Sequence, residues 1–123
     1  HFTDVETVIA QLQPIVKSGA TLIAEVDLMT HTGVLRSRDP LNIYRYSDAF
    51  YNRMRFSGIP NRLRPKAYQK ILERYGWHNI QLIPLQQLPL EYVQKISPQL
   101  ARRFQREDAN MDVLTFLIRA TKK

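Results

Sequence analysis

The chain has 123 residues, which is enough for one modest domain that buries about two-thirds of its unfolded surface. It has no cysteine, so disulfides, thiolate zinc sites and a cysteine nucleophile are excluded. A formal net charge of +7 at pH 7 favours an anionic partner, but the basic residues are dispersed, which is typical of a solvated basic surface.

The first elements expected are a helix and a buried strand. Thr3 and Glu6 have the spacing of a capping box, and apolar residues recur at helical spacing over residues 5–15. The stretch "TLIAEVDL" begins at Thr21 and ends at Leu28, and its nearly continuous apolar character predicts a strand covered on both faces. A helix followed by a buried strand is half of an α/β unit.

Residues 29–60 form a long segment without a regular pattern. Such an insertion in a small domain is often a lid or a binding loop. Within it a short helix is expected over residues 47–55, with Ser47 as its N-cap and with Tyr46 and Phe50 on one face. The alternative is that the aromatic residues of this segment pack a small local core.

The second half of the chain begins with a clear helix signal. Pro65 suits a first helical turn and Gly76 suits a helix end, so a helix is expected over residues 65–75. A strand is expected over residues 79–85, where Pro84 suits an edge position.

The last elements expected are two short helices, over residues 90–96 and 98–104, and a final strand over residues 113–120. This order of elements predicts a mixed α/β fold with a small sheet. The strand over residues 21–28 would lie at the edge of that sheet or beside a strand encoded before residue 1. Its apolar character favours the second arrangement.

The sequence by itself contains no complete catalytic constellation. The glycines at 19, 33, 58 and 76 never have the spacing of a phosphate-binding loop, and no serine lies in a nucleophile elbow. The three histidines are isolated from one another and from carboxylates, so no metal site is expected.

Two groups of polar residues are candidates for a site. Asp27 and His31 follow the first strand, where open α/β sheets bind ligands if the strand is parallel. The alternatives are that Asp27 caps the next turn and that His31 is a surface loop residue. The "NRLR" group, from Asn61 to Arg64, could bind a carboxylate or phosphate with its guanidinium groups, or could tie the loop to the next helix.

The opening stretch "HFTDVETVIAQLQPIVKSGATLIAEVD" resembles the segment after the fourth strand of Rossmann-like S-adenosylmethionine-dependent methyltransferases. His1 and Phe2 match the pair that commonly ends that strand, while Ser18 and Ala20 replace a usual proline and a second glycine. "NRLRPKAYQKILERYGWHNIQLIPL" resembles the family's next helix and sixth strand, and "MDVLTFLIRATKK" resembles its antiparallel seventh strand.

The resemblance implies a partial Rossmann-like three-layer sandwich, whose mixed sheet has the strand order 5-7-6 with the last strand antiparallel. Residues 1–123 would form a single unit, the C-terminal part of a methyltransferase domain, with residues 29–60 as a substrate-recognition insertion. The glycine-rich cofactor loop belongs to the other half of that domain, so most of the S-adenosylmethionine site would lie there. The chain would then be a truncated domain, inactive in isolation.

The resemblance also implies roles for particular residues. His1 and Phe2 would lie near the methionine end of the cofactor. If the acceptor must lose a proton, His31 or His1 would be the general base, and His31 is the catalytic candidate. The residues expected to face the methyl acceptor are Asp27, Tyr44, Tyr46, Tyr51, Asn61, Arg62 and Arg64.

Two other functions are compatible with the sequence. One is a non-catalytic basic module that binds nucleic acid or an acidic partner, and the other is a structural subunit that pairs the strand over residues 21–28 with a second copy. The expected methyl acceptor is a small molecule, although the residues do not distinguish it from lipid, RNA or protein. No signal peptide and no membrane-length apolar run occurs in the sequence, so a cytoplasmic protein is expected.

Overall fold

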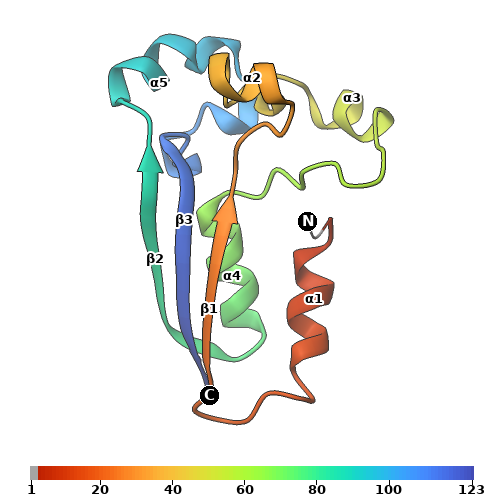
Figure 1. The fold of residues 1–123 in the computed structure, drawn as a ribbon, viewed down its shortest axis with the longest axis vertical. Coiled ribbons are helices and arrows are strands. Elements are labelled where there is room, and N and C mark those ends of the chain that lie inside the picture. Colours follow the sequence, from red (N-terminus) through yellow and green to blue (C-terminus); the bar gives the residue numbers. More distant parts are fainter. Residues whose placement is uncertain (1–2) are drawn as a thin grey trace.

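The computed structural model describes residues 3–123, in which three strands form one open sheet (Figure 1). The strands are β1 (Thr21–Asp27), β2 (Trp77–Gln87) and β3 (Val113–Lys122), and they lie in the order β1-β3-β2. β3 pairs antiparallel with both neighbours, so β1 and β2 run in the same direction. The predicted α/β class is confirmed.

The central strand is also the most buried. β3 is rich in β-branched and aromatic residues, which favour a strand, and its residues 113–116, Ile118 and Ala120 are buried. Its Phe116 lies opposite Val26 on one side and Pro84 on the other. β2 is an edge strand with register shifts around Pro84, as expected for a residue that donates no ladder hydrogen bond.

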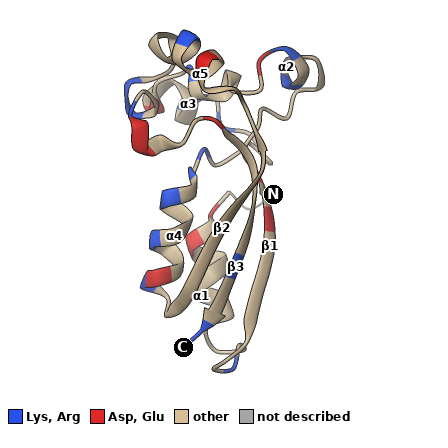
Figure 2. Ribbon diagram, turned by 90° about the vertical axis from the view of Figure 1, so that its left-hand side faces the viewer, with Lys and Arg blue, Asp and Glu red and all other residues tan. Residues whose placement is uncertain are grey.

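Among residues 3–123, helices cover one face of this sheet. α1 (Val5–Leu12) and α4 (Pro65–Arg74) lie on the same side of the strands, as Figure 2 shows. The core between them is centred on Phe116, whose ring meets Tyr68 edge to face with the centroids 5.5 Å apart. Its buried members are Ile9, Leu28, Tyr68, Ile71, Leu72, Trp77, Val113, Phe116, Ile118 and Ala120.

The other face of the sheet is open in the part of the chain that the structure describes. Ile23 on β1 is 65% exposed and Ile83 on β2 is 43% exposed, and both lie on that face beside β3. The prediction that the first strand is covered on both faces is therefore wrong for residues 3–123. The described residues form two layers at the sheet, and the finer Rossmann-like three-layer arrangement stays a prediction.

The first helix begins one residue later than the capping-box pattern predicts. Asp4 is the N-cap, and its Oδ1 accepts a hydrogen bond from the Thr7 amide at 2.9 Å. A carboxylate at this position also interacts favourably with the positive end of the helix dipole, which a Thr3 hydroxyl does not. The competing acid explains why the Thr3–Glu6 prediction is wrong.

The predicted helix before the second strand is confirmed as α4. Pro65 lies in its first turn, and Gly76 has φ of +74°, a left-handed conformation that glycine adopts without a side-chain clash. Trp77 follows this turn and is buried in the core.

A layer of short helices lies at the end of the sheet toward which β1 points (Figure 1). It consists of α2 (Gly33–Arg38), η1 (Asn42–Tyr44), α3 (Asp48–Arg53), α5 (Leu90–Ile96), η2 (Ser97–Gln99), η3 (Arg102–Phe104) and η4 (Glu107–Ala109). These elements share a second core that includes Leu41, Tyr44, Ile96, Leu100 and Phe104. Tyr44 is thus buried in a small second core, as the alternative for residues 29–60 predicts, but that core also contains residues from the segment 96–114.

Two details of this layer differ from the sequence-based expectations. Residues 98–104 are not one helix but parts of two 3-10 turns, because the backbone becomes extended at Leu100 and Ala101. α2 is an additional helix that no periodic pattern predicts. Within residues 3–123 no helix is both long enough and apolar enough to cross a bilayer.

Candidate functional site

A concave feature that combines apolar and polar residues lies beside β1, near its carboxyl end. It is a cavity of about 540 Å³, which is within the size range of small-molecule sites. Its apolar wall comes from α1, β1 and α4, and the members of this wall are Val5, Val8, Ile9, Leu12, Leu22, Ala24, Val26, Leu28, Leu63, Ile71, Leu72 and Ile118.

One part of the cavity lining is polar. It includes Asp27, His31, Tyr44, Asn61 and Arg62, which the sequence singles out, and Glu25 of β1, which it does not. The structure therefore brings together residues that come from the segment after β1 and from the segment before α4. Tyr46, Tyr51 and Arg64 do not line this cavity, and His1 and Phe2 lie outside the described residues.

Asp27 organises the turn that leaves β1. Its Oδ1 accepts a hydrogen bond from the Met29 amide at 2.9 Å, and its Oδ2 pairs with the Arg36 guanidinium of α2 at 2.8 Å. The carboxylate is thus both a turn cap and a lining group of the cavity. This arrangement supports the turn-capping alternative and leaves substrate binding by Asp27 a prediction.

Thr30 and Tyr44 fix the next segment beneath the short helices. The Thr30 hydroxyl, 2% exposed, accepts a hydrogen bond from the Ile43 amide at 3.2 Å. The Tyr44 hydroxyl donates to the Leu28 carbonyl at 2.7 Å. Burial raises the pKa of Tyr44, which the neighbouring Arg64 counteracts, so the phenol stays protonated and serves as a donor.

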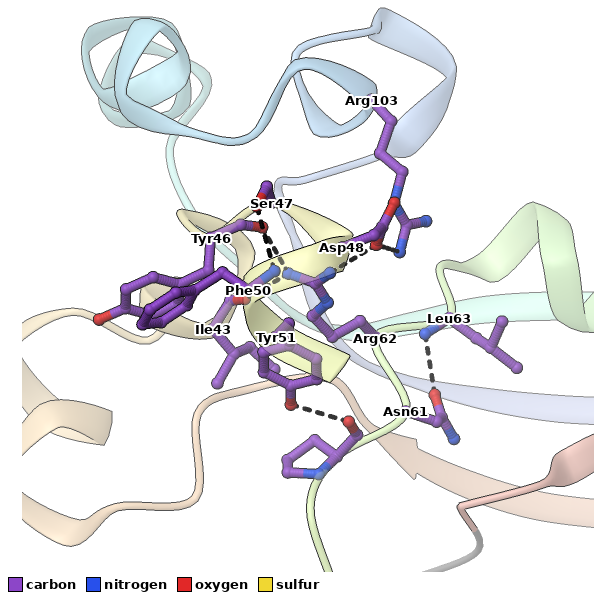
Figure 3. A network of polar contacts seen from close by, with 11 residues as sticks. Ile43, Tyr46, Ser47, Asp48, Phe50, Tyr51, Asn61, Arg62, Leu63 and Arg103 are labelled. Atoms are coloured by element: carbon purple, nitrogen blue, oxygen red, sulfur yellow. Dashed lines mark hydrogen bonds and ion pairs between the residues drawn. The ribbon is translucent and has the colours of Figure 1, made fainter. Parts of the chain in front are cut away.

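Arg62 is the centre of a polar network that ties three segments together (Figure 3). Its Nη1 donates to the carbonyls of Ile43 at 3.0 Å and Tyr46 at 2.7 Å, and its Nη2 pairs with Asp48 at 2.5 Å. The guanidinium also lies 3.9 Å from the centroid of the Tyr51 ring. Burial lowers the pKa of Arg62, and the Asp48 carboxylate opposes this shift.

The Arg64 guanidinium makes even more hydrogen bonds within the chain than that of Arg62. Its side chain, in a residue 6% exposed, donates to the carbonyls of Ala109 at 3.1 Å, Asn110 at 2.6 Å and Val113 at 2.7 Å. A fourth bond goes to the Tyr44 hydroxyl at 3.1 Å. The structure therefore favours the alternative in which the two arginines tie the loop to the helix start.

Asn61 holds the turn before α4 and lines the cavity together with Arg62. Its Oδ1 accepts a hydrogen bond from the Leu63 amide at 2.8 Å, and its Nδ2 approaches the Tyr68 hydroxyl at 3.4 Å. The backbone of Arg62 has φ of 58°, a left-handed conformation that is uncommon outside glycine. From this turn the Arg62 guanidinium reaches the carbonyls of Ile43 and Tyr46 in the short-helix layer.

Tyr51 is expected to ionise only at strongly alkaline pH. Burial raises its pKa to about 12, against the opposing effect of Arg62, and its hydroxyl donates to the Pro60 carbonyl at 2.8 Å. The folded state disfavours the Tyr51 phenolate. The contribution of the neutral Tyr51 phenol to folding stability is therefore fully present below the ordinary pKa of about 10 and is lost as pH rises through 12.

The variant Tyr51→Phe tests this expectation. Its ultraviolet titration should lack one phenolate transition near pH 12, and its stability should fall less steeply between pH 10 and 12 than that of the parent. The matched control is Tyr46→Phe, which removes a more exposed ring and should leave the transition near pH 12 in place. Loss of the same transition in both variants would contradict the assignment.

The sequence did not identify Asp48 and Arg103 as site residues, although both lie in the polar network. Arg103 Nη2 pairs with Asp48 Oδ1 at 2.8 Å, although the two residues are 55 positions apart in the sequence. No local sequence pattern predicts such a pair, because the two residues come together only when the short helices pack. Over residues 3–123, no cluster of three or more His, Asp or Glu side chains suits a metal ion.

The cavity can bind an amphipathic small molecule. Its wall provides a large apolar surface, and Asp27, His31 and Asn61 provide acceptors and donors on its polar side. Comparison with protein-family models, with curated proteins and with solved structures found no match to the chain. The chemistry of this site is therefore argued from its own residues.

Proposed function

We propose that the chain is the C-terminal, substrate-side portion of an S-adenosylmethionine-dependent methyltransferase domain. The observation that carries the proposal is the strand order β1-β3-β2, with the last strand in the middle and antiparallel to both neighbours. In the proposal β1, β2 and β3 correspond to strands 5, 6 and 7 of the family's sheet, whose order would then be 5-7-6. The cavity beside β1 supports the proposal, because ligands of open α/β sheets bind at the carboxyl ends of strands.

In this proposal the described residues position the methyl acceptor rather than activate the cofactor. Such a reaction depends mainly on holding the acceptor in line with the sulfonium methyl group and on excluding water. The apolar wall would exclude water, and Asp27 and Asn61 would orient the acceptor. Where the acceptor must lose a proton, His31 is the group placed to accept it.

The cofactor would bind mainly to residues that precede this segment in the family's domain. The outer edge of β1 pairs with no other strand within residues 3–123, and the proposal places a further strand of the family's sheet beside it. His1 and Phe2 would lie near the methionine end of the cofactor. The acceptor is proposed to be a small molecule, and the enzyme is proposed to be cytoplasmic.

Calorimetry with S-adenosylmethionine tests this proposal. The 123-residue chain should show no tight binding, whereas the chain extended by the in-frame sequence encoded before His1 should bind the cofactor. S-adenosylhomocysteine should compete with it, since both share the nucleoside and the amino-acid end. An extended chain that folds and binds neither compound would overturn the proposal.

A second candidate is a structural module that completes its sheet with another copy. The free edge of β1 favours it, because an unpaired edge strand is a template for pairing with a second chain. Light scattering separates the two candidates. A stable dimer of the 14.5 kDa chain that persists on dilution would favour the structural module, and a monomer would exclude it.

A further inference from the structure

The segment that contains α3 exposes an unusual set of large apolar side chains. Tyr46 is 39% exposed, Phe50 50%, Met54 59% and Phe56 66%. Tyr46 and Phe50 stack on each other with their centroids 5.4 Å apart, and Figure 3 shows both rings pointing away from Arg62. Single exposed apolar residues are ordinary, but several within one short segment mark an interaction surface.

The segment that carries these exposed side chains is held in place at α3 by a cap and by ion pairs. The Ser47 hydroxyl caps α3 by accepting from the Phe50 amide, and Asp48 is shared by Arg62 and Arg103 (Figure 3). On the inner side, the Tyr51 ring lies against the Arg62 guanidinium. α3 therefore presents its outer residues from a fixed position.

The same segment is basic. Arg53 and Arg55 are exposed and alternate with the apolar residues, and the structure shows no acidic partner for either among residues 3–123. The acid of this segment, Asp48, is already paired with two other arginines. The aromatic–basic patch is defined by Tyr46, Phe50, Arg53, Met54, Arg55 and Phe56.

α2 repeats this combination at the same end of the molecule. Val34 is 68% exposed and Leu35 38% exposed, and Arg38 of the same short helix is exposed as well, whereas Arg36 is paired with Asp27. Both views of the fold place α2 and α3 at the end of the molecule toward which β1 points (Figures 1 and 2). Apolar tips and arginines are therefore concentrated at this end.

We propose that the aromatic–basic patch docks on the surface of an anionic lipid bilayer. Arginines are attracted to the negative headgroups, while aromatic and aliphatic side chains insert at the boundary between headgroups and acyl chains. A single-stranded nucleic acid would stack on the rings but would leave Met54, Val34 and Leu35 in water. The aliphatic tips therefore favour the bilayer. The proposal does not depend on methyl transfer.

Vesicle sedimentation with the 123-residue chain tests this inference. The chain should partition onto vesicles of mixed phosphatidylcholine and phosphatidylglycerol, and more weakly onto phosphatidylcholine alone. The double variant Phe50→Ser/Phe56→Ser should bind about tenfold more weakly, because it removes the two exposed rings from the interface. The double variant Arg53→Gln/Arg55→Gln should bind about 25-fold more weakly to anionic vesicles, at about fivefold for each arginine.

The control variant is Ile83→Ser/Leu85→Ser on β2. These residues are 43% and 52% exposed but lie away from the patch, so vesicle binding should stay unchanged. Circular dichroism should show the same denaturation midpoint for the parent and both patch variants. Equal binding to both lipid mixtures, no binding to either, or an equal loss in the β2 control would overturn the proposal. Displacement of the chain from vesicles by single-stranded RNA, added at the same total negative charge as the anionic lipid, would assign the patch to nucleic acid instead.

Discussion

Replacing Arg64 with alanine is expected to lower the free energy of unfolding by about 3–5 kcal/mol. The guanidinium donates to three carbonyls and one hydroxyl. Its removal leaves the buried carbonyls of Ala109 and Val113 without these donors, and each unsatisfied buried group costs about 1–3 kcal/mol. The Asn110 carbonyl keeps its bond from the Val113 amide, and the Tyr44 hydroxyl keeps its bond to the Leu28 carbonyl. Urea unfolding followed by circular dichroism measures the loss.

Two further variants make this result specific. Arg64→Lys should recover only a small part of the stability, because a single ammonium group cannot reproduce the planar fork that reaches Ala109, Asn110 and Val113. Arg102→Ala removes an exposed arginine from the same region and should change stability by less than about 0.5 kcal/mol. If Arg64→Ala and Arg102→Ala were equally stable, the buried role of Arg64 would be refuted.

Replacing Phe116 with alanine should be similarly damaging, with a loss of about 3–5 kcal/mol. Its ring is 1% exposed, lies on the covered face of the central strand and meets Tyr68 edge to face. The substitution removes apolar burial and leaves a cavity between β3 and α4 that the helix cannot collapse into without losing other contacts. Chemical denaturation of both proteins gives the difference.

The neighbouring residue provides the matched control for Phe116. Leu117 points to the opposite face of the same strand, because successive side chains alternate across a sheet. Leu117→Ala should cost about 1 kcal/mol or less, since the described residues place no helix over that face. A loss as large as that of Phe116→Ala would show that the second face is covered in solution.

Several elements could be predicted because their signals are local. Pro65 and Gly76 bound α4, and Ser47 caps α3, each through its own backbone geometry or a hydrogen bond within one turn. The choice between Thr3 and Asp4 as the first N-cap was not decided by spacing, because two capping residues were adjacent. α2 was missed because six residues carry too little periodicity.

The candidate site was predictable in its composition but not in its roles. Asp27, His31 and Asn61 were identified from their positions beside strand and helix ends, and all three line the cavity. Arg62 and Arg64 were equally prominent in the sequence, yet both donate within the chain. The three carbonyls that accept hydrogen bonds from Arg64 lie 45 to 49 residues further along the sequence. No local sequence pattern predicts contacts between residues so far apart in the chain.

The pattern of residues along the chain is sufficient for the α/β class, for α4 and for the positions of the strands. Helical and strand periodicity, helix caps and turn glycines act over a few residues, so they can be read without coordinates. Three features arise from contacts between distant segments. They are the middle position of β3, the coverage of one sheet face, and the hydrogen bonds that the two buried arginines donate to backbone carbonyls. Those features follow from which apolar faces pack together and which buried carbonyls need a donor, and both depend on the assembled fold.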